Sequence, residues 1–485
     1  MIFVGTNRGI LEAIDSRLGK EVWGFVPYNL LPKLRTLKDG QSIGAFDYLV
    51  DGSPKIADFK LVDSTWHTML VFGQGPGGTF YTALDVTMDD IALTVPSTSD
   101  DLNALLSYFN DPTRIPVAWT YPLLGNFDPK ISNTTMPYGD IASWAKPAEK
   151  TVGQTWSDPA IGQIKSNTTS FVVLVGSGFM PYSAQQQANR GGAIAGTTFY
   201  MLRAYDGTLL GTKDVGNDGG PEETSSPLGD NCVLANNCSR MKNALQSDPV
   251  ATGPADSRFI SVAYIGDLDG RVWRFDFDLD TSVPPAPIFK SGTNPTKLYE
   301  DTANHQPIFS SMATVNVGGV HQYIFFGTGS DLLPSNGVSQ AYKLVGVLDN
   351  GPSGTVTFNP ILLKVDGSGD DEKVTAFPAV AGDIVFFTTT SFKPQTPCTA
   401  PDAKLYALTF IGGPAYDTNA DNKFDNSDST LVKTLVGVRA TAPFIVDQHL
   451  VFGTGTNLQM FGDKDDFNNG VGQAGVRILS WREIR

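Results

Sequence analysis

The chain has 485 residues, more than one ordinary globular core contains, so it forms either several domains or one large repetitive domain. It has 50 Gly, 31 Pro, 29 Phe and 15 Tyr but only 18% charged residues, which favours short strands joined by turns and predicts an all-β fold. The formal net charge of −15, without a basic stripe, argues against nucleic acid as a partner. The chain also has no run of about 18 apolar residues that could span a membrane.

The first residues do not resemble a secretion signal. Met1 leads directly into the apolar strand Ile2–Gly5, whereas a signal peptide has a basic stretch before a long apolar one. We therefore expect the chain to be a fragment or a processed C-terminal portion of an exported protein, with the export signal outside this sequence.

A repeated unit runs along the chain. Each copy has an apolar strand that ends in Gly, a small polar turn, a second strand with aromatic residues and a turn that contains Asp. About seven copies can be recognised, at residues 3–25, 69–85, 171–206, 260–276, 323–344, 384–408 and 450–461.

A further strand, small or Pro-rich, precedes the copies, as at residues 53–58, 157–161, 306–309, 375–380 and 441–445. Three or four strands per copy form a propeller blade, and radial packing of blades buries both faces of each sheet and protects the sheet edges. The sequence therefore predicts a single β-propeller domain over residues 1–485, with residues 476–484 as an ordered last strand at the ring closure.

Two long segments depart from the repeat and are expected to be surface insertions on the blade rims, where binding usually resides. The first covers about residues 87–155 and includes a short helix predicted over Asp100–Phe109, with Ser99 or Asp100 as its N-cap. The second covers about residues 214–248 and is rich in Gly, Asp and Asn.

Three cysteines give limited information. Cys232 and Cys238 are spaced for a short disulfide in an oxidising compartment, although two unpaired thiols remain the alternative, and Cys398 is left over. The four His are scattered and none lies at ligand spacing from a Cys, which argues against a zinc site.

The candidate chemistry concentrates in one acidic loop, residues 417–428. Aligned with the EF-hand template, this loop has side-chain oxygens at positions 1, 3, 5, 9 and 12 and a backbone carbonyl at position 7. Calcium takes about six to eight oxygen ligands, which alternating short acidic side chains on a curled loop present. The expected calcium ligands are Asp417, Asn419, Asp421, the carbonyl of Lys423, Asp425 and Asp428.

Two positions of this loop depart from the template. Position 6, normally Gly, is Asn422, the residue type next most tolerant of the left-handed conformation. Position 12, normally Glu, is Asp428, which reaches less far and so binds in one mode, through water, or not at all. The alternative to calcium is a solvated acidic turn. Strands predicted at residues 405–411 and 431–436 flank the loop, so the site would staple a hairpin and would not open a helix pair.

Other candidate sites are weaker. Gly266–Gly270 lies at a hairpin and is most simply a tight turn, and Asp463–Gly470 has loose ligand spacing.

Residues 13–23 are similar to the tryptophan-docking repeat of quinoprotein dehydrogenases, but active members also have a vicinal disulfide, and this chain has no adjacent Cys. Gly73–Gly78 lacks the Lys and the helix of a phosphate-binding loop, and no catalytic triad stands out. We therefore predict a protein that is not an enzyme.

Several segments together resemble the C-terminal domain of the PilC/PilY family of type IV pilus tip proteins. They span nearly the whole chain, at residues 4–15, 23–27, 31–34, 51–54, 66–70, 80–86, 155–159, 266–276, 326–329 and 480–484. The resemblance implies a modified seven-bladed, quinoprotein-like β-propeller with long inter-strand insertions and a calcium loop late in the domain.

The resemblance also implies a role. Family members lie at the pilus tip or cell surface with the minor pilins, support pilus assembly, oppose retraction when calcium is bound, affect twitching motility, and adhere to host or abiotic surfaces. Carried over, their calcium ligands fall on Asp417, Asn419, Asp421, Lys423 and Asp425, with Asp428 less secure. The sequence has no Arg-Gly-Asp tripeptide and no von Willebrand-like region. The alternatives are a quinoprotein-like periplasmic oxidoreductase and a propeller adhesin unrelated to pili.

Overall fold

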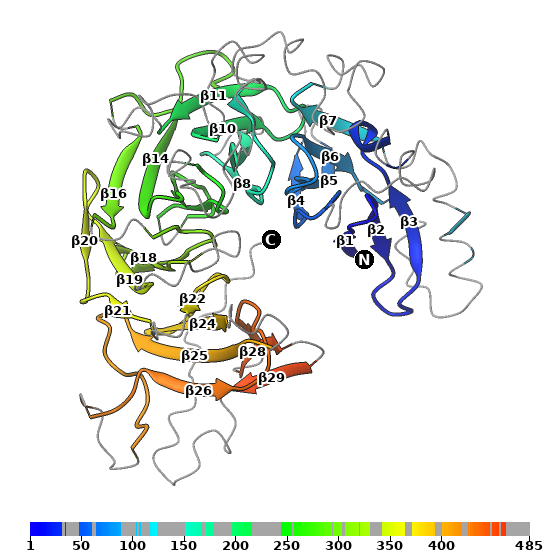
Figure 1. Cartoon of the computed structure of the whole chain (residues 1–485). Coiled ribbons are helices and arrows are strands. Elements are labelled where there is room, and N and C mark those ends of the chain that lie inside the picture. The colour runs from blue at the N-terminus through cyan, green and yellow to red at the C-terminus, as the bar shows by residue number, and fades with distance from the viewer. Residues whose placement is uncertain are drawn as a thin grey trace, which may run out of the picture.

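The computed structural model describes residues 1–31, 34, 48–60, 65–88, 103, 106–107, 116–123, 151–165, 170–178, 196–215, 244–254, 257–292, 294–302, 306–319, 321–329, 342–363, 371–392, 400–419, 425, 427–446, 449–454 and 457–461. Within these residues the strands form seven antiparallel sheets arranged as blades around a common axis (Figure 1). The prediction of an all-β, seven-bladed propeller is confirmed.

Blades 1 to 3 follow one another from the N-terminus. Blade 1 consists of β1 (Ile2–Gly5), β2 (Leu11–Ile14) and β3 (Glu21–Phe25), followed by the short 3₁₀ helix η1 (Tyr28–Leu30). Blade 2 consists of β4 (Lys55–Lys60), β5 (Trp66–Phe72), β6 (Tyr81–Asp85) and β7 (Val117–Tyr121). Blade 3 consists of β8 (Ala160–Gln163), β9 (Phe171–Gly176), β10 (Thr198–Arg203) and β11 (Leu209–Asp214).

Blades 4 and 5 each end in two strands that pair with the same neighbour. Blade 4 consists of β12 (Val250–Thr252), β13 (Val262–Gly266) and β14 (Arg271–Leu279), with both β15 (Pro287–Phe289) and β16 (Thr296–Glu300) on β14. Blade 5 consists of β17 (Ala313–Val317), β18 (His321–Gly327) and β19 (Lys343–Asp349), with both β20 (Gly354–Val356) and β21 (Ile361–Leu362) on β19.

Blades 6 and 7 complete the described ring. In blade 6, β22 (Asp371–Lys373) and β23 (Ala379–Ala381) both pair with β24 (Ile384–Phe392), and β25 (Asp402–Thr409) and β26 (Leu431–Leu435) follow. Blade 7 consists of β27 (Phe444–Val446), β28 (His449–Thr454) and β29 (Asn457–Phe461).

Packing between blades explains why the middle strands are apolar on both faces. Every residue of β13 is buried, as is every residue of β9 after the first, because a neighbouring blade covers each face of the sheet. Six hydrophobic clusters join consecutive blades, from blades 1 and 2 to blades 6 and 7. The core of this protein is therefore a series of layers between the blades.

The innermost strands lie next to one another around the axis: β4, β8, β12, β17, β23 and β27 contact each other in turn. Each follows a short segment that we call its lead-in segment: residues 52–54, 157–159, 247–249, 310–312, 376–378 and 441–443. Three lead-in segments carry a hydroxyl that accepts a hydrogen bond from a Gly N–H of its own blade. These pairs are Ser157 with Gly176 (3.0 Å), Ser247 with Gly266 (3.0 Å) and Thr441 with Gly453 (2.8 Å).

The repeated Gly at the end of the second strand has a physical reason. A Cβ atom at Gly176 would lie 2.3 Å from the carbonyl oxygen of Leu245, just before the lead-in segment of the next blade. At Gly73 it would lie 2.4 Å from the carbonyl oxygen of Thr155. Only Gly lets the two backbones approach so closely.

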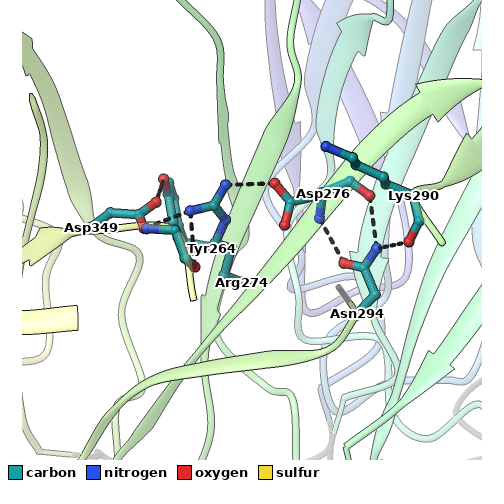
Figure 2. A network of polar contacts seen from close by, with 7 residues as sticks. Tyr264, Arg274, Asp276, Lys290, Asn294 and Asp349 are labelled. Carbon is teal, nitrogen blue, oxygen red and sulfur yellow. Dashed lines mark hydrogen bonds and ion pairs between the residues drawn. The ribbon is translucent and has the colours of Figure 1, made fainter. Parts of the chain in front are cut away.

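A network of buried polar groups also joins blades 4 and 5 (Figure 2). Asp349, at the end of β19, accepts hydrogen bonds from the Tyr264 hydroxyl and from Nη1 of Arg274, both at 2.6 Å. The other end of the Arg274 guanidinium donates to Asp276 at 2.6 Å. Asn294 extends the network through hydrogen bonds with the backbone of Asp276. The Asp349 side chain is only 4% exposed, so this pairing holds a buried charge.

The structure corrects three details of the sequence-based account. Residues 306–309 form no strand; Ile308 makes a single bridge with Gly329, and the inner strand of that blade is β17 instead. Residues 87–155 are not one continuous insertion, because β7 lies within this range and pairs with β6. Residues 244–247, expected in the second insertion, are buried against the blades.

Other predictions fall on residues that the structure does not describe. These are most of the helix predicted over Asp100–Phe109, the last strand at residues 476–484, and Cys232, Cys238 and Cys398. In the described part of the chain, no helix has the length and apolar character needed to cross a membrane.

Candidate functional site

The predicted calcium loop, residues 417–428, connects two neighbouring strands of blade 6. β25 and β26 pair antiparallel, from Ala403 opposite Leu435 to Tyr406 opposite Leu431. The prediction that strands flank the loop is therefore confirmed. Four of the six predicted ligands, Asp417, Asn419, Asp425 and Asp428, are described by the structure, whereas Asp421 and Lys423 lie outside the described residues.

The carboxylate of Asp428 holds the two ends of the loop together. Its Oδ1 accepts hydrogen bonds from the backbone N–H groups of Thr418 (2.7 Å) and Asn419 (3.3 Å), and its Oδ2 accepts one from the N–H of Asp425 (3.1 Å). The hydroxyl of Thr418 in turn accepts a hydrogen bond from the N–H of Ser429 at 2.6 Å. Asp428, at template position 12, thus closes the loop by accepting hydrogen bonds from the backbone N–H groups at positions 2, 3 and 9.

Ser427 joins two of the other predicted ligands. Its hydroxyl donates to Oδ1 of Asp425 at 2.6 Å and accepts from Nδ2 of Asn419 at 2.7 Å, while its N–H also donates to Asp425 at 2.8 Å. Asn419 and Asp425, at template positions 3 and 9, therefore lie on the same side of the loop. Sequence reasoning did not single out Ser427, because the EF-hand template assigns no ligand to its position.

Hydrogen bonding favours the charged form of Asp425 and Asp428. The hydrogen bonds from the side chain and N–H of Ser427 lower the pKa of Asp425. Desolvation raises the pKa of Asp428, but the N–H groups of Asp425, Thr418 and Asn419 oppose it and bring the pKa below the ordinary value. Both groups are thus ionised at neutral pH, as ligands of a hard cation must be.

An aromatic contact anchors the start of the loop to the next blade. Tyr416, directly before Asp417, is 8% exposed and lies in the cluster between blades 6 and 7. Its ring packs edge-on against Phe461 of β29, with 5.4 Å between the ring centroids. Tyr416 thus connects the loop to the blade 6–7 interface. A lone aromatic residue before an acidic run is too weak a sequence pattern to predict this contact.

The donor set suits calcium by its chemistry, although the described residues alone do not complete a site. They contain no group of three or more His, Cys, Asp or Glu side chains placed to hold a metal ion. The loop offers hard oxygen donors on a short, curled segment, which is what calcium selects. Asp428 is already engaged by several N–H donors, so its main contribution is to shape the loop.

The second acidic turn, Gly266–Gly270, is a tight turn between β13 and β14, as predicted. The Asp267 carboxylate accepts hydrogen bonds from the N–H groups of Asp269 and Arg271, both at 2.9 Å, and from Nε1 of Trp273 at 2.8 Å. Burial raises the pKa of Asp267 to about 7, against the effect of these donors. The carboxylate oxygens of Asp267 therefore stabilise the turn by accepting these hydrogen bonds. The third acidic turn, Asp463–Gly470, lies outside the described residues.

Comparison with known proteins relates the chain to type IV pilus proteins. It is 25% identical over 325 residues to the type IV pilus biogenesis factor PilY1 of Pseudomonas aeruginosa, covering 65% of this chain and 21% of that protein. It is 27% identical over 333 residues to a PilY1 homologue of Xylella fastidiosa, covering 68% of this chain and 20% of that protein. The chain thus spans about a fifth of the length of these curated relatives. No protein-family model matches it.

The fold agrees with one solved structure over nearly its whole length. The crystal structure of the Pseudomonas aeruginosa PilY1 C-terminal domain superposes with a TM-score of 0.57 at 16% sequence identity, covering 95% of this chain and 92% of that domain. The sequence relatives and this shared fold together confirm the resemblance to a PilY-type C-terminal propeller.

Proposed function

Since the chain is related in sequence to PilY1 proteins and has the fold of a PilY1 C-terminal domain, we propose that it is the calcium-binding propeller of a non-enzymatic type IV pilus component. The relatives are named as pilus biogenesis factors, which supports a role in pilus assembly. We place the propeller outside the cell, at the pilus tip, after export through the periplasm.

The loop closure by Asp428 is the observation that carries the calcium proposal. It brings the N-terminal and C-terminal ends of the loop together, so the ligands Asp417, Asn419, Asp421, the carbonyl of Lys423 and Asp425 would surround one ion. Bound calcium would offset the repulsion between the clustered carboxylates and cross-link the two ends of the β25–β26 hairpin. Asp428 would act mainly by holding the loop N–H groups.

Calcium control of retraction would follow from the anchoring of the loop. Because Tyr416 packs against Phe461, an ion that orders the loop would also stiffen the interface between blades 6 and 7. A stiffer tip protein would stay engaged with the minor pilins and oppose retraction, and so affect twitching motility. Adhesion to a host or abiotic surface would be a further task of the same exposed propeller.

A genetic experiment tests the pilus role and the calcium role separately. In the source bacterium, deletion of the propeller is expected to reduce the pili sheared from the cell surface. Asp425→Ala is expected to reduce surface pili only while the retraction motor is active, because calcium then no longer opposes retraction. Asp383→Ala, an exposed Asp in the β23–β24 turn, serves as the matched control. Normal piliation after deletion would reject the pilus role, and normal piliation in Asp425→Ala alone would reject the calcium role.

A further inference from the structure

A cavity of about 530 Å³ lies at the propeller axis, and none of its described lining residues belongs to the predicted calcium loop. Its wall comes from the lead-in segments of six blades, and the same position in each segment lines it: Ser53, Asp158, Asp248, Ser311, Phe377 and Ala442. The volume is in the range of small-molecule sites, about 300–1,000 Å³. The lead-in segment recurs in six blades, but the residue at its middle position varies among the blades. The cavity wall is therefore chemically asymmetric, which a site for one specific ligand requires.

Hydrogen bonds link four of these lead-in segments side by side. The N–H of Ser53 donates to Oδ1 of Asp158 at 2.9 Å, and the N–H of Asp158 donates to Oδ1 of Asp248 at 2.8 Å. The hydroxyl of Ser311 donates to the carbonyl oxygen of Asp248 at 3.2 Å. The two carboxylates therefore occupy fixed positions on adjacent blades.

The charges of these two carboxylates are balanced differently. Lys55 lies 3.5 Å from Oδ2 of Asp158, whereas the Asp248 carboxylate receives one hydrogen bond, from the N–H of Asp158, among the described residues. Burial and the neighbouring Asp158 raise the pKa of Asp248. Asp51 also lines the cavity, and Arg439 is the single cation among the described lining residues. Asp248 therefore holds its proton more tightly than a free carboxyl does, and a cation placed beside it would favour its charged form.

A second, independent feature indicates a ligand. Gln246 lines the cavity and is only 2% exposed, yet neither its Nε2 nor its Oε1 has a hydrogen-bond partner within the described residues. Ser310 also lines this cavity, and its buried hydroxyl likewise has no hydrogen-bond partner within the described residues. Leaving a buried amide or hydroxyl unpaired destabilises the protein, so a bound molecule that paired with these groups would recover the lost free energy.

These features select the kind of molecule. A bound anion would face the carboxylates, and no three acidic, His or Cys side chains of the described residues gather to hold a metal ion. Trp156 and Phe309 add an aromatic surface, with their ring centroids 6.1 Å apart, and such rings favour organic cations. We propose that the central cavity binds a small organic molecule with a primary amine, whose ammonium group lies beside Asp248 and Asp158 and whose polar groups pair with Gln246 and Ser310.

The test compares an amine with a neutral molecule of the same shape. Tyramine and its alcohol analogue tyrosol are titrated into the purified chain by calorimetry in EGTA, and 1,5-diaminopentane with 1,5-pentanediol provides a second pair. We expect at least one amine to bind and its neutral analogue to bind about tenfold more weakly or not at all. Asp248→Asn keeps the acceptor for the Asp158 N–H, so this variant should fold but bind the amine about tenfold more weakly.

Controls make each outcome decisive. Asp383→Asn changes an exposed Asp outside the cavity and should bind the amine like the wild type. Circular dichroism and melting curves establish that the Asp248→Asn variant is folded. The proposal is overturned if neither amine binds at millimolar concentration, if the neutral analogues bind equally well, or if Asp248→Asn leaves amine binding unchanged. Stabilisation by magnesium or calcium that Asp248→Asn abolishes and Asp425→Ala retains would also overturn it, since the cavity would then hold a metal ion.

Discussion

The cavity wall and the calcium loop show two ways in which one propeller can hold polar side chains. The wall is assembled from six distant lead-in segments, and hydrogen bonds from Gly N–H groups fix three of them to their blades. The loop is one stretch whose described side chains hydrogen-bond within the loop itself and whose described anchor on the blades is Tyr416. Changes in or behind the wall should therefore alter the stability of the whole domain, whereas changes in the loop should alter local opening and the response to calcium.

The largest effect is expected where blade 4 meets blade 5. Asp349→Ala would leave the Arg274 guanidinium without its inter-blade carboxylate, and among the described residues only the Gly351 carbonyl would then pair with it across the interface (Figure 2). Breaking a buried pair from one side costs about 3–5 kcal/mol, so urea unfolding should show a loss of this size. Asp383→Ala, at an exposed turn, should stay within about 0.5 kcal/mol of the wild type. Similar losses in both variants would mean that the network does not hold the blades together.

A somewhat smaller effect is expected from the close approach of backbones behind the wall. The Cβ of Gly176→Ala would lie 2.3 Å from the carbonyl oxygen of Leu245, so one backbone must move at a cost of about 1–3 kcal/mol. Near the calcium loop, Gly413→Ala meets no atom closer than 3.3 Å and should cost much less in the same urea titration. Equal costs would remove the contrast between a tightly packed wall and a tolerant loop.

The charge on the wall predicts a pH dependence that the loop does not share. Asp158 lies beside Asp248 and is itself paired with Lys55, and burial together with Asp158 raises the pKa of Asp248 in the folded protein. The folded state then binds a proton more tightly than the unfolded state, so this group's contribution to stability falls as pH rises from about 4 through the raised pKa. Asp248→Asn removes this loss, and its stability relative to the wild type should increase with pH in urea titrations. A pH-independent difference would contradict the account.

The smallest effect is expected at Asp428, and it should be local. Without its carboxylate, the N–H groups of Thr418, Asn419 and Asp425 lose their acceptor. In EGTA, Asp428→Ala should therefore speed hydrogen exchange at Thr418 and Asn419 while the amides of β25 stay protected. Asp425→Ala, which leaves these two hydrogen bonds in place, should not speed exchange there. Unchanged exchange in Asp428→Ala would show that another group closes the loop.

The same contrast explains what the sequence could predict. The predicted ligands lie in one stretch with the EF-hand spacing, so the sequence alone indicates residues 417–428 as a candidate calcium loop, and the flanking strands that it predicts are present. The six lead-in residues that line the cavity are spread along the chain from Ser53 to Ala442, and no local sequence pattern shows that they meet at the axis. Strand β12 has only three residues, too few for a recognisable pattern, and residues 306–309 resemble a strand in sequence because Ile308 follows Pro307, as the inner strands of other blades follow a Pro.

A melting experiment shows whether the loop binds calcium. The wild-type chain and the Asp425→Ala and Asp383→Ala variants are melted in calcium and in EGTA. Calcium that binds only the folded state stabilises it by RT ln(1 + [Ca²⁺]/Kd), about 1.4 kcal/mol at a tenfold excess over Kd. The account predicts a higher Tm in calcium for the wild type and Asp383→Ala, and the same Tm in both solutions for Asp425→Ala. If Asp425→Ala responds to calcium as the wild type does, the loop is not the calcium site.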